Sequence, residues 1–142
     1  MEVSEVRKRV TASIEQARAR AQARRQRHAE AERAYAAFLE NVAGPLARQV
    51  ANILKGTGHG FTVFTPAGGL RLDADRGRDD HVEFELDLEG EHPQVVVRTR
   101  RSRGSRTLED VRPVKAGTSP EALTEDEVLA ALLAALAPWL ER

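Results

Sequence analysis

The stretch His81-Val82-Glu83-Phe84-Glu85-Leu86-Asp87-Leu88-Glu89 decides the fold class of this chain. Its apolar side chains alternate strictly with acidic ones, which is the pattern of a β-strand with one buried face and one face in water. The turn residues that follow at 90–93 predict a hairpin, and residues 94–100 predict its second strand. The chain therefore contains an antiparallel sheet.

Strands are also expected on either side of this hairpin. Residues 61–64 and 70–72 predict an earlier hairpin, since the segment between them, Thr65-Pro66-Ala67-Gly68-Gly69, is rich in turn residues. A fifth, short strand is expected at residues 107–114. Together these segments predict an antiparallel meander of four or five strands.

Helices are expected before and after the sheet. Residues 3–43 contain no Gly or Pro and are dominated by strong helix formers, so they predict one long helix. Gly44-Pro45 is expected to end it and to start a short second helix, which ends at Gly56 in the left-handed conformation. The sequence Thr124-Glu125-Asp126-Glu127 predicts a capping box at the start of a last helix. The apolar stripe of that helix is expected to pack on one face of the sheet, and it consists of Val128, Leu129, Leu132, Leu133 and Leu136.

The predicted fold class is therefore α+β: a long N-terminal helix, a short helix, an antiparallel four- to five-stranded meander and a C-terminal helix packed on one sheet face. Two parts are expected, a helical arm over residues 1–43 and an α+β domain over residues 45–142. The large apolar residues from Tyr35 onward suffice for a core. Residues 15–34, which precede Tyr35, carry no large apolar side chain. They predict a solvated rod, an alanine-lined contact with another helix, or a partly frayed segment.

Two helical surfaces predict self-association. The arm carries apolar residues at its start, including Val6 and Val10, that a lone rod would leave in water. The last helix has an uncharged alanine side formed by Ala130, Ala134 and Ala137. We expect these five residues to form the interface of a dimer or larger homo-oligomer. The alternative is that the arm folds back and covers the last helix within one chain.

Composition excludes several classes of protein. The 142 residues include no Cys, which excludes disulfide frameworks, thiol catalysis and Cys-based metal sites. The N-terminus lacks the layout of a signal peptide, and the longest apolar run, Val128 to Leu140, is too short to span a membrane. We therefore expect a cytoplasmic protein with no membrane span.

Charge is distributed unevenly along the chain. The formal net charge is zero, but residues 1–55 carry eleven basic against six acidic side chains, and the remainder carries the opposite excess. Residues 98–106 hold five arginines. Arg98 and Arg100 are expected to lie opposite the acidic face of the neighbouring strand. Three arginines are left for an anionic partner or for solvent, namely Arg101, Arg103 and Arg106.

The arm carries a second basic cluster, in which Arg20, Arg24 and Arg27 share one side of the helix. These side chains are either solvated, in contact with a phosphate backbone, or part of a helical protein contact. Aromatic platforms typical of nucleic-acid recognition are absent near both clusters.

No catalytic residue, metal site or cofactor is predicted. The Gly56–Gly60 segment closes a helix and opens a strand, the reverse of a nucleotide-binding loop, so a helix cap is favoured over a ligand loop. The carboxylates of residues 73–80 fail the EF-hand spacing, which favours a solvated hairpin loop over a weak divalent site. The four histidines fall in four different elements. The sequence thus predicts a non-enzymatic protein-interaction or adaptor module with a protein partner of acidic character, and the alternative is a nucleic-acid-binding accessory protein.

Overall fold

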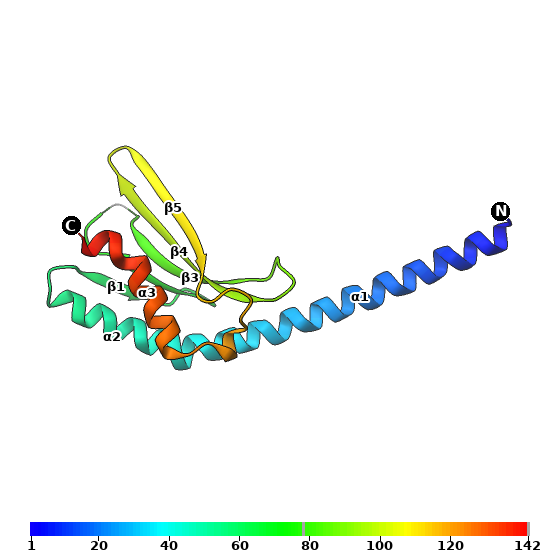
Figure 1. Ribbon diagram of the computed structural model, residues 1–142, viewed down its shortest axis with the longest axis horizontal. Coiled ribbons are helices and arrows are strands. Elements are labelled where there is room, and N and C mark those ends of the chain that lie inside the picture. Colours follow the sequence, from blue (N-terminus) through cyan, green and yellow to red (C-terminus); the bar gives the residue numbers. More distant parts are fainter. Residues whose placement is uncertain (78, 142) are drawn as a thin grey trace.

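The computed structural model describes residues 1–77 and 79–141. A long helix is followed by a five-stranded sheet and a final helix (Figure 1). The elements, in chain order, are α1 (Val3–Phe38), the π-helical turn η1 (Leu39–Ala43), α2 (Gly44–Lys55), β1 (Phe61–Phe64), β2 (Leu70–Ala74), β3 (His81–Asp87), β4 (Gln94–Arg103), β5 (Arg106–Pro113), the 3₁₀ turn η2 (Pro120–Ala122) and α3 (Glu125–Leu140).

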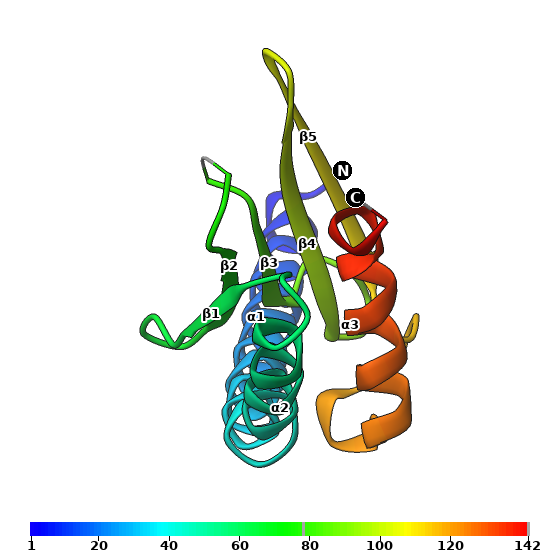
Figure 2. The same cartoon turned by 90° about the vertical axis from the view of Figure 1, so that its left-hand side faces the viewer.

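The sheet is an antiparallel meander with the strand order β1-β2-β3-β4-β5. The covered face of the sheet follows the alternation in the sequence. Val82 and Phe84 of β3 are buried, while the acidic residues Glu83 and Glu85 that alternate with them are half-exposed. Figure 2 shows α2 beneath the β1–β2 end of the sheet and α3 alongside β4. The predicted α+β fold class, with the final helix packed on the sheet, is confirmed.

The first helix does not end at Gly44-Pro45 as expected. The Gly44 N–H donates to the Leu39 carbonyl five residues earlier, and the chain passes through η1 into α2 without leaving helical conformation. A π-helical turn suits this position because Pro45 has no N–H to donate, and the wider turn makes room for its ring. A side chain at position 44 would collide with the Leu39 carbonyl oxygen, so glycine is needed there.

The helix end at α2 also differs in detail from the expectation. Gly56 keeps a right-handed φ of −72°. The left-handed residue is Gly58, with φ +83°. The Thr57 hydroxyl donates to the Leu54 carbonyl at 2.8 Å and satisfies one of the free carbonyls of the last turn. The segment therefore closes a helix, as favoured from its sequence context.

The core lies between the helices and the covered face of the sheet. Val128, Leu132 and Leu136 of α3 are fully buried against it. The prediction that Leu133 belongs to this stripe was wrong, since its side chain is 43% exposed, and Leu129 is only half-buried. A helix with 3.6 residues per turn can pack about three positions in every two turns against a single sheet. Leu133 lies outside the part of the α3 surface that faces the sheet.

The acidic segment at residues 73–80 is not a uniformly solvated loop. Asp73 belongs to β2 and pairs with Arg71 at 2.7 Å. Asp80 is 2% exposed; its carboxylate accepts from the Trp139 indole N–H at 3.0 Å and from the Ser102 backbone N–H at 2.8 Å. The solvated-loop prediction was therefore wrong for Asp80, which is buried because α3 places a donor over it. Within the described ranges, no three His, Asp or Glu side chains gather so as to hold a metal ion.

The predicted capping box starts α3. The Thr124 hydroxyl accepts from the Glu127 N–H at 3.2 Å, and the Glu127 carboxylate accepts from the Thr124 N–H at 2.9 Å. Lys115 adds an ion pair to the same carboxylate at 2.9 Å. The Thr124 backbone N–H, the Lys115 ammonium and the Thr124 hydroxyl hold the pKa of Glu127 below its ordinary value.

We expect the stabilising effect of Glu127 to depend on pH. A folded-state pKa below the unfolded one means that the contribution is present at neutral pH and is lost as the pH falls through the acidic range below about 4.5. Glu127→Gln keeps an acceptor for the Thr124 N–H but cannot titrate. Thermal melts between pH 3 and pH 7 should therefore show a smaller pH dependence of Tm in Glu127→Gln than in the native protein. Parallel curves for the two proteins would contradict this assignment.

The arm projects from the body as the free part of α1 (Figure 1). Residues 1–20 are exposed without exception, and burial on α1 begins at Ala31 and continues at Tyr35 and Phe38. The alternative in which the arm folds back over the last helix is therefore wrong for the single chain. An unbroken run of helix formers holds the arm straight, and no turn residue precedes Gly44.

Candidate functional site

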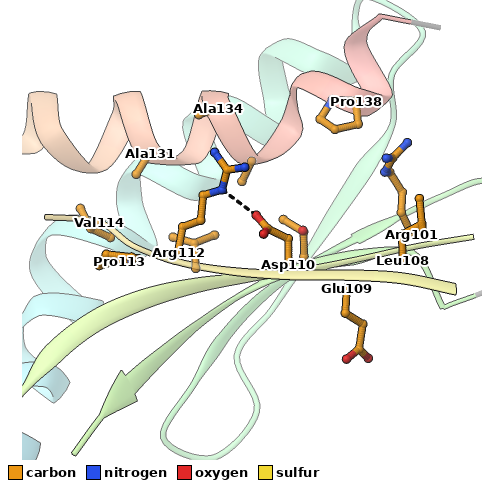
Figure 3. Close-up of a pocket in the computed structure, with 13 residues that line it drawn as sticks. Arg101, Leu108, Glu109, Asp110, Arg112, Pro113, Val114, Ala131, Ala134 and Pro138 are labelled. Atoms are coloured by element: carbon orange, nitrogen blue, oxygen red, sulfur yellow. Dashed lines mark ion pairs between the residues drawn. The ribbon is translucent and has the colours of Figure 1, made fainter. Parts of the chain in front are cut away.

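A groove separates α3 from the hairpin formed by β4 and β5 (Figure 3). Its volume is about 340 Å³. Small and apolar side chains of α3 and of the strand ends line one side, and charged side chains of the hairpin line the other. The lining residues are Val97, Thr99, Arg101, Leu108, Glu109, Asp110, Arg112, Pro113, Val114, Ala131, Ala134, Ala135 and Pro138.

The groove exists because β4 and β5 run past the rest of the sheet. Pairing of β3 with β4 stops at His81 and Arg100, whereas pairing of β4 with β5 continues to Arg103 and Arg106. A tight turn closes the hairpin, with Gly104 in the left-handed conformation at φ +65°. The protruding ribbon is visible in Figure 2 above the other strands.

The groove stays open on the α3 side because the side chains that α3 contributes there are mostly alanines. Ala131, Ala134 and Ala135 line the groove, and Figure 3 shows Ala131 and Pro138 on the side of α3 that faces the strands. A leucine at either alanine position would fill the space, since a leucine side chain is three carbon atoms larger. Of the three alanines for which the sequence suggested a second helix, only Ala134 lines this groove.

The hairpin supplies basic side chains to one face of the ribbon. Strand alternation puts Arg101 and Arg103 on the face that also carries Val97, and Arg106 lies opposite Arg103 in the register. Figure 3 shows Arg101 on the α3 side of the strands and Glu109 pointing away from it. In the described part of the chain, no carboxylate lies within ion-pair distance of these three arginines.

The remaining charges of the groove neutralise one another. Arg112 pairs with Asp110 at 2.8 Å, and both side chains are largely exposed. Such a pair contributes little to stability and can be exchanged for a ligand group. Arg101 lines the groove without an ion-pair partner in the described chain, and Arg103 and Arg106 add positive charge at the tip of the hairpin beyond it.

The expected cross-strand pairs are half confirmed. Arg98 makes a two-pronged contact with Glu85, at 2.9 Å from Nε and 3.1 Å from the second nitrogen. The prediction for Arg100 was wrong, because the register sets it opposite His81 and its nearest carboxylate is Glu109 of β5 at 3.9 Å. The sequence did not reveal this register, since the position of the turn between β3 and β4 determines it.

β5 offers an unpaired strand edge beside the groove. It is the last strand of the sheet, and every residue from Arg106 to Pro113 is exposed. Leu108 and Val111 are 37% and 44% exposed, respectively. The backbone N–H and C=O groups of a free edge can pair with another extended chain. Charged side chains on both faces of β5 discourage pairing with strands that do not carry complementary charge.

The structure brings some of the predicted site residues together and separates others. Arg101 and Ala134 line the groove, and Arg103 and Arg106 lie at the tip of the same hairpin, beyond the lining residues. Ala130 is exposed and Ala137 half-buried, and neither lines the groove. The arm residues lie on the projecting helix, away from the hairpin (Figure 1), and they are Val6, Val10, Arg20, Arg24 and Arg27.

Sequence reasoning missed Leu108, Asp110 and Arg112 as groove residues. Their spacing of two along β5 was the available signal, because alternate residues of a strand share a face. Residues 106–113 alternate only weakly in hydrophobicity, so the sequence did not indicate which of them share a face of the strand.

No protein-family model, curated protein or solved structure matches the chain. Over residues 1–77 and 79–141, none of the helices combines the length and the hydropathy that crossing a membrane requires.

Proposed function

We propose that this chain is a non-enzymatic protein-interaction or adaptor module that self-associates through its helices and holds an acidic segment of a protein partner in the groove between α3 and the β4–β5 hairpin. The observation that carries the proposal is the combination of a groove with one small, apolar wall, three hairpin arginines without ion-pair partners in the described chain, and the free edge of β5. Cations on the rim of an apolar floor attract carboxylates without adding a catalytic group.

An extended segment fits this site better than a helix does. The β5 edge presents backbone N–H and C=O groups over residues 106–113, and a partner strand added there would pair with them. Alternate side chains of such a strand would face both the alanine wall and the arginines, which share the α3 side of the hairpin, and the side chains between them would face solvent. The favoured partner is therefore a segment in which acidic residues recur at every second position.

Replacing Arg101, Arg103 and Arg106 together with Ser should weaken binding of such a segment about tenfold or more. Three exposed charge contacts of ~0.5 kcal/mol each amount to a change of this size. Fluorescence anisotropy with a labelled Val-Glu alternating octapeptide measures the affinity. The Tm should stay within about 2 °C of the native value, because exposed charges contribute little to stability.

Matched variants make this test specific. Arg20, Arg24 and Arg27 replaced together with Ser remove the same charge from the arm and should leave peptide affinity unchanged. Ala134→Glu introduces a carboxylate into the groove wall and should weaken the peptide as the triple arginine change does. Equal affinity of the native and the Arg101/Arg103/Arg106 proteins, with the fold intact, would remove the groove as the binding site.

A second candidate function is contact with a nucleic-acid backbone. The observation that favours it is the middle of the arm, where exposed arginines have no carboxylate within ion-pair distance in the described chain, namely Arg18, Arg20, Arg24, Arg25 and Arg27. Phosphate contacts release counterions, so such binding would weaken steeply with salt. The Arg20/Arg24/Arg27 variant separates the two functions: a mobility shift of duplex DNA that this variant abolishes, while peptide affinity is unaffected, assigns the arm to nucleic acid.

A further inference from the structure

A second groove lies where the arm joins the body. One wall is the last part of α1 and η1, and the others are the β1–β2 turn and the end of β3, enclosing about 520 Å³. The groove is apolar and acidic: Leu39, Leu86 and Leu88 line it together with Glu32, Glu83 and Glu85. We name it the basal groove.

The arm carries an exposed apolar stripe formed by Val3, Val6, Val10 and Ile14. This stripe lies on the same face of the helix as the wall of the basal groove. Val3, Ile14, Ala21, Glu32 and Leu39 follow one another at separations of 11, 7, 11 and 7 residues. Each separation is a whole number of helical turns to within about 20° at 3.6 residues per turn. One continuous face of α1 and η1 therefore carries the stripe at its start and the groove wall at its end.

This stripe is unusually apolar for a helix in water. Val3, Val6, Val10 and Ile14 are between 44% and 75% exposed. A shallow hollow around Val10 and Ile14 continues along the helix to Ala17. A row of large apolar side chains at helical spacing on a projecting rod is typical of a contact surface.

The stripe cannot reach the basal groove of its own chain. Both lie on one unbroken helix, and the 36 residues of α1 span about 54 Å. An occupant that carries this stripe must therefore come from another molecule.

We infer that the apolar stripe of the arm docks in the basal groove of a second copy, with the two α1 helices antiparallel. This inference rests on the self-association proposed above and names the surface that carries it. An antiparallel pair places the stripe of each copy against the groove wall of the other, so a twofold axis satisfies both contacts at once. Two helices of this kind pack with axes about 8–10 Å apart.

Charge complementarity favours this occupant. In the basal groove, Glu85 is held by Arg98 and Glu83 is 3.9 Å from His81, while Glu32 has no cation within ion-pair distance in the described chain. The stripe is flanked by Arg7, which is likewise without an ion pair there. A basic apolar segment thus meets an acidic apolar groove.

The wall of the basal groove also holds an unsatisfied polar group. Tyr35 is 6% exposed, and its hydroxyl has no hydrogen-bond partner among the described residues. Burial raises the pKa of Tyr35, and the negative charges of Glu85 and Glu83 raise it further. The phenol therefore keeps its proton, and a docked segment that carries hydroxyl or guanidinium groups can supply the missing partner.

The register of the antiparallel pair follows from placing the stripe of one copy against the groove wall of the other. Aligning the middle of Val3–Ile14 with the middle of Glu32–Leu39 brings Arg7 of one copy between Glu32 and Glu40 of the other. Ala21 then lies near the twofold axis, where a small side chain permits close approach. Arg18 and Arg25 flank it, and their long side chains can turn outward into solvent.

Charge reversal with rescue tests this pairing on the full chain. Light scattering at 5–100 µM should give a mass of twice 15.7 kDa for the native protein. Arg7→Glu alone, and Glu32→Arg with Glu40→Arg, should each shift the protein to the monomer mass, with at least a tenfold rise in the dimer Kd. All three changes in one chain should restore the dimer. A monomeric native protein, or three changes that fail to restore association, would overturn the inference.

Cross-linking tests the antiparallel direction. The chain has no Cys, so a single introduced Cys reports on its own position. Ala21→Cys should form a disulfide-linked dimer under a mild oxidant, since the two copies of residue 21 meet near the axis. Val10→Cys is the matched control and should remain uncross-linked, whereas equal cross-linking at both positions would show a parallel pair and overturn the register.

The two proposals fail separately. Peptide affinity at the groove beside α3 should be the same in the Arg7→Glu protein as in the native one, because the arm takes no part in that site. Loss of association with intact peptide binding would show that the stripe carries the dimer. A monomeric native protein that still binds the peptide would overturn self-association and the docking of the arm, and would leave the peptide site standing.

Discussion

Removal of residues 1–43 should unfold the protein, whereas removal of residues 1–27 should leave a folded body with a cooperative thermal transition. The longer truncation deletes Tyr35 and Phe38, which are 6% and 4% exposed and belong to the core cluster. Their rings stack with centroids 6.1 Å apart, and Phe38 meets Phe84 of β3 edge-on at 6.5 Å. Truncating one buried aromatic side chain costs about 3–5 kcal/mol, so losing two approaches the whole stability of a small domain.

Circular dichroism and thermal melts of the two truncated proteins check this result. The shorter truncation removes only exposed or half-buried residues, so it serves as the control for the loss of the arm itself. A cooperative transition in the protein that lacks residues 1–43, at a Tm close to the native one, would show that the last turns of α1 are dispensable. That outcome would support the boundary at residue 44, which stays a prediction from the sequence.

Asp80→Ala should destabilise the protein by about 2–4 kcal/mol and lower its Tm by roughly 10 °C. The change leaves the buried Trp139 indole N–H and the part-buried Ser102 N–H without the carboxylate that accepts from them. Each unsatisfied buried donor costs about 1–3 kcal/mol. The carboxylate joins the start of β3 to the last turn of α3, 59 residues apart in the sequence, so its loss should loosen both ends.

Urea denaturation of matched variants isolates the contact. Asp75→Ala removes an exposed carboxylate of the same loop, which accepts from Thr62, and should cost less than about 1 kcal/mol. Trp139→Phe removes the donor while keeping an aromatic ring in the pocket. The Asp80→Ala/Trp139→Phe protein should then be more stable than the sum of the single changes implies. Strict additivity would contradict a direct contact between the two side chains.

Local patterns sufficed to predict most of the elements. The alternation of residues 81–89 predicted β3 and the direction of its buried face, and Thr124 with Glu127 predicted the start of α3. Each of these signals is confined to a few neighbouring residues. The physical cause is equally local, namely the two-residue repeat of a strand and the unpaired N–H groups of a first helical turn.

The site was less accessible from the sequence. Its arginines were identified from their density, but the groove that gives them a partner surface is made by α3 and β5, which meet only in the folded chain. The partner of Arg100 was missed for the same reason, because a strand register is set by turns and by packing.

The sequence by itself determined the period of each segment and hence its type: the long unbroken helix, the meander and the capped final helix. Only the tertiary structure decided that Gly44 continues a helix, that Asp80 is buried beneath Trp139, and that Ala131, Ala134 and Ala135 of α3 line a groove. Whether a segment repeats as a helix or as a strand depends on residues within about four positions of one another. A short stretch of sequence is therefore enough to show it. Burial, register and cavities depend on which distant surfaces come together, and for Asp80 that surface is a tryptophan 59 residues away.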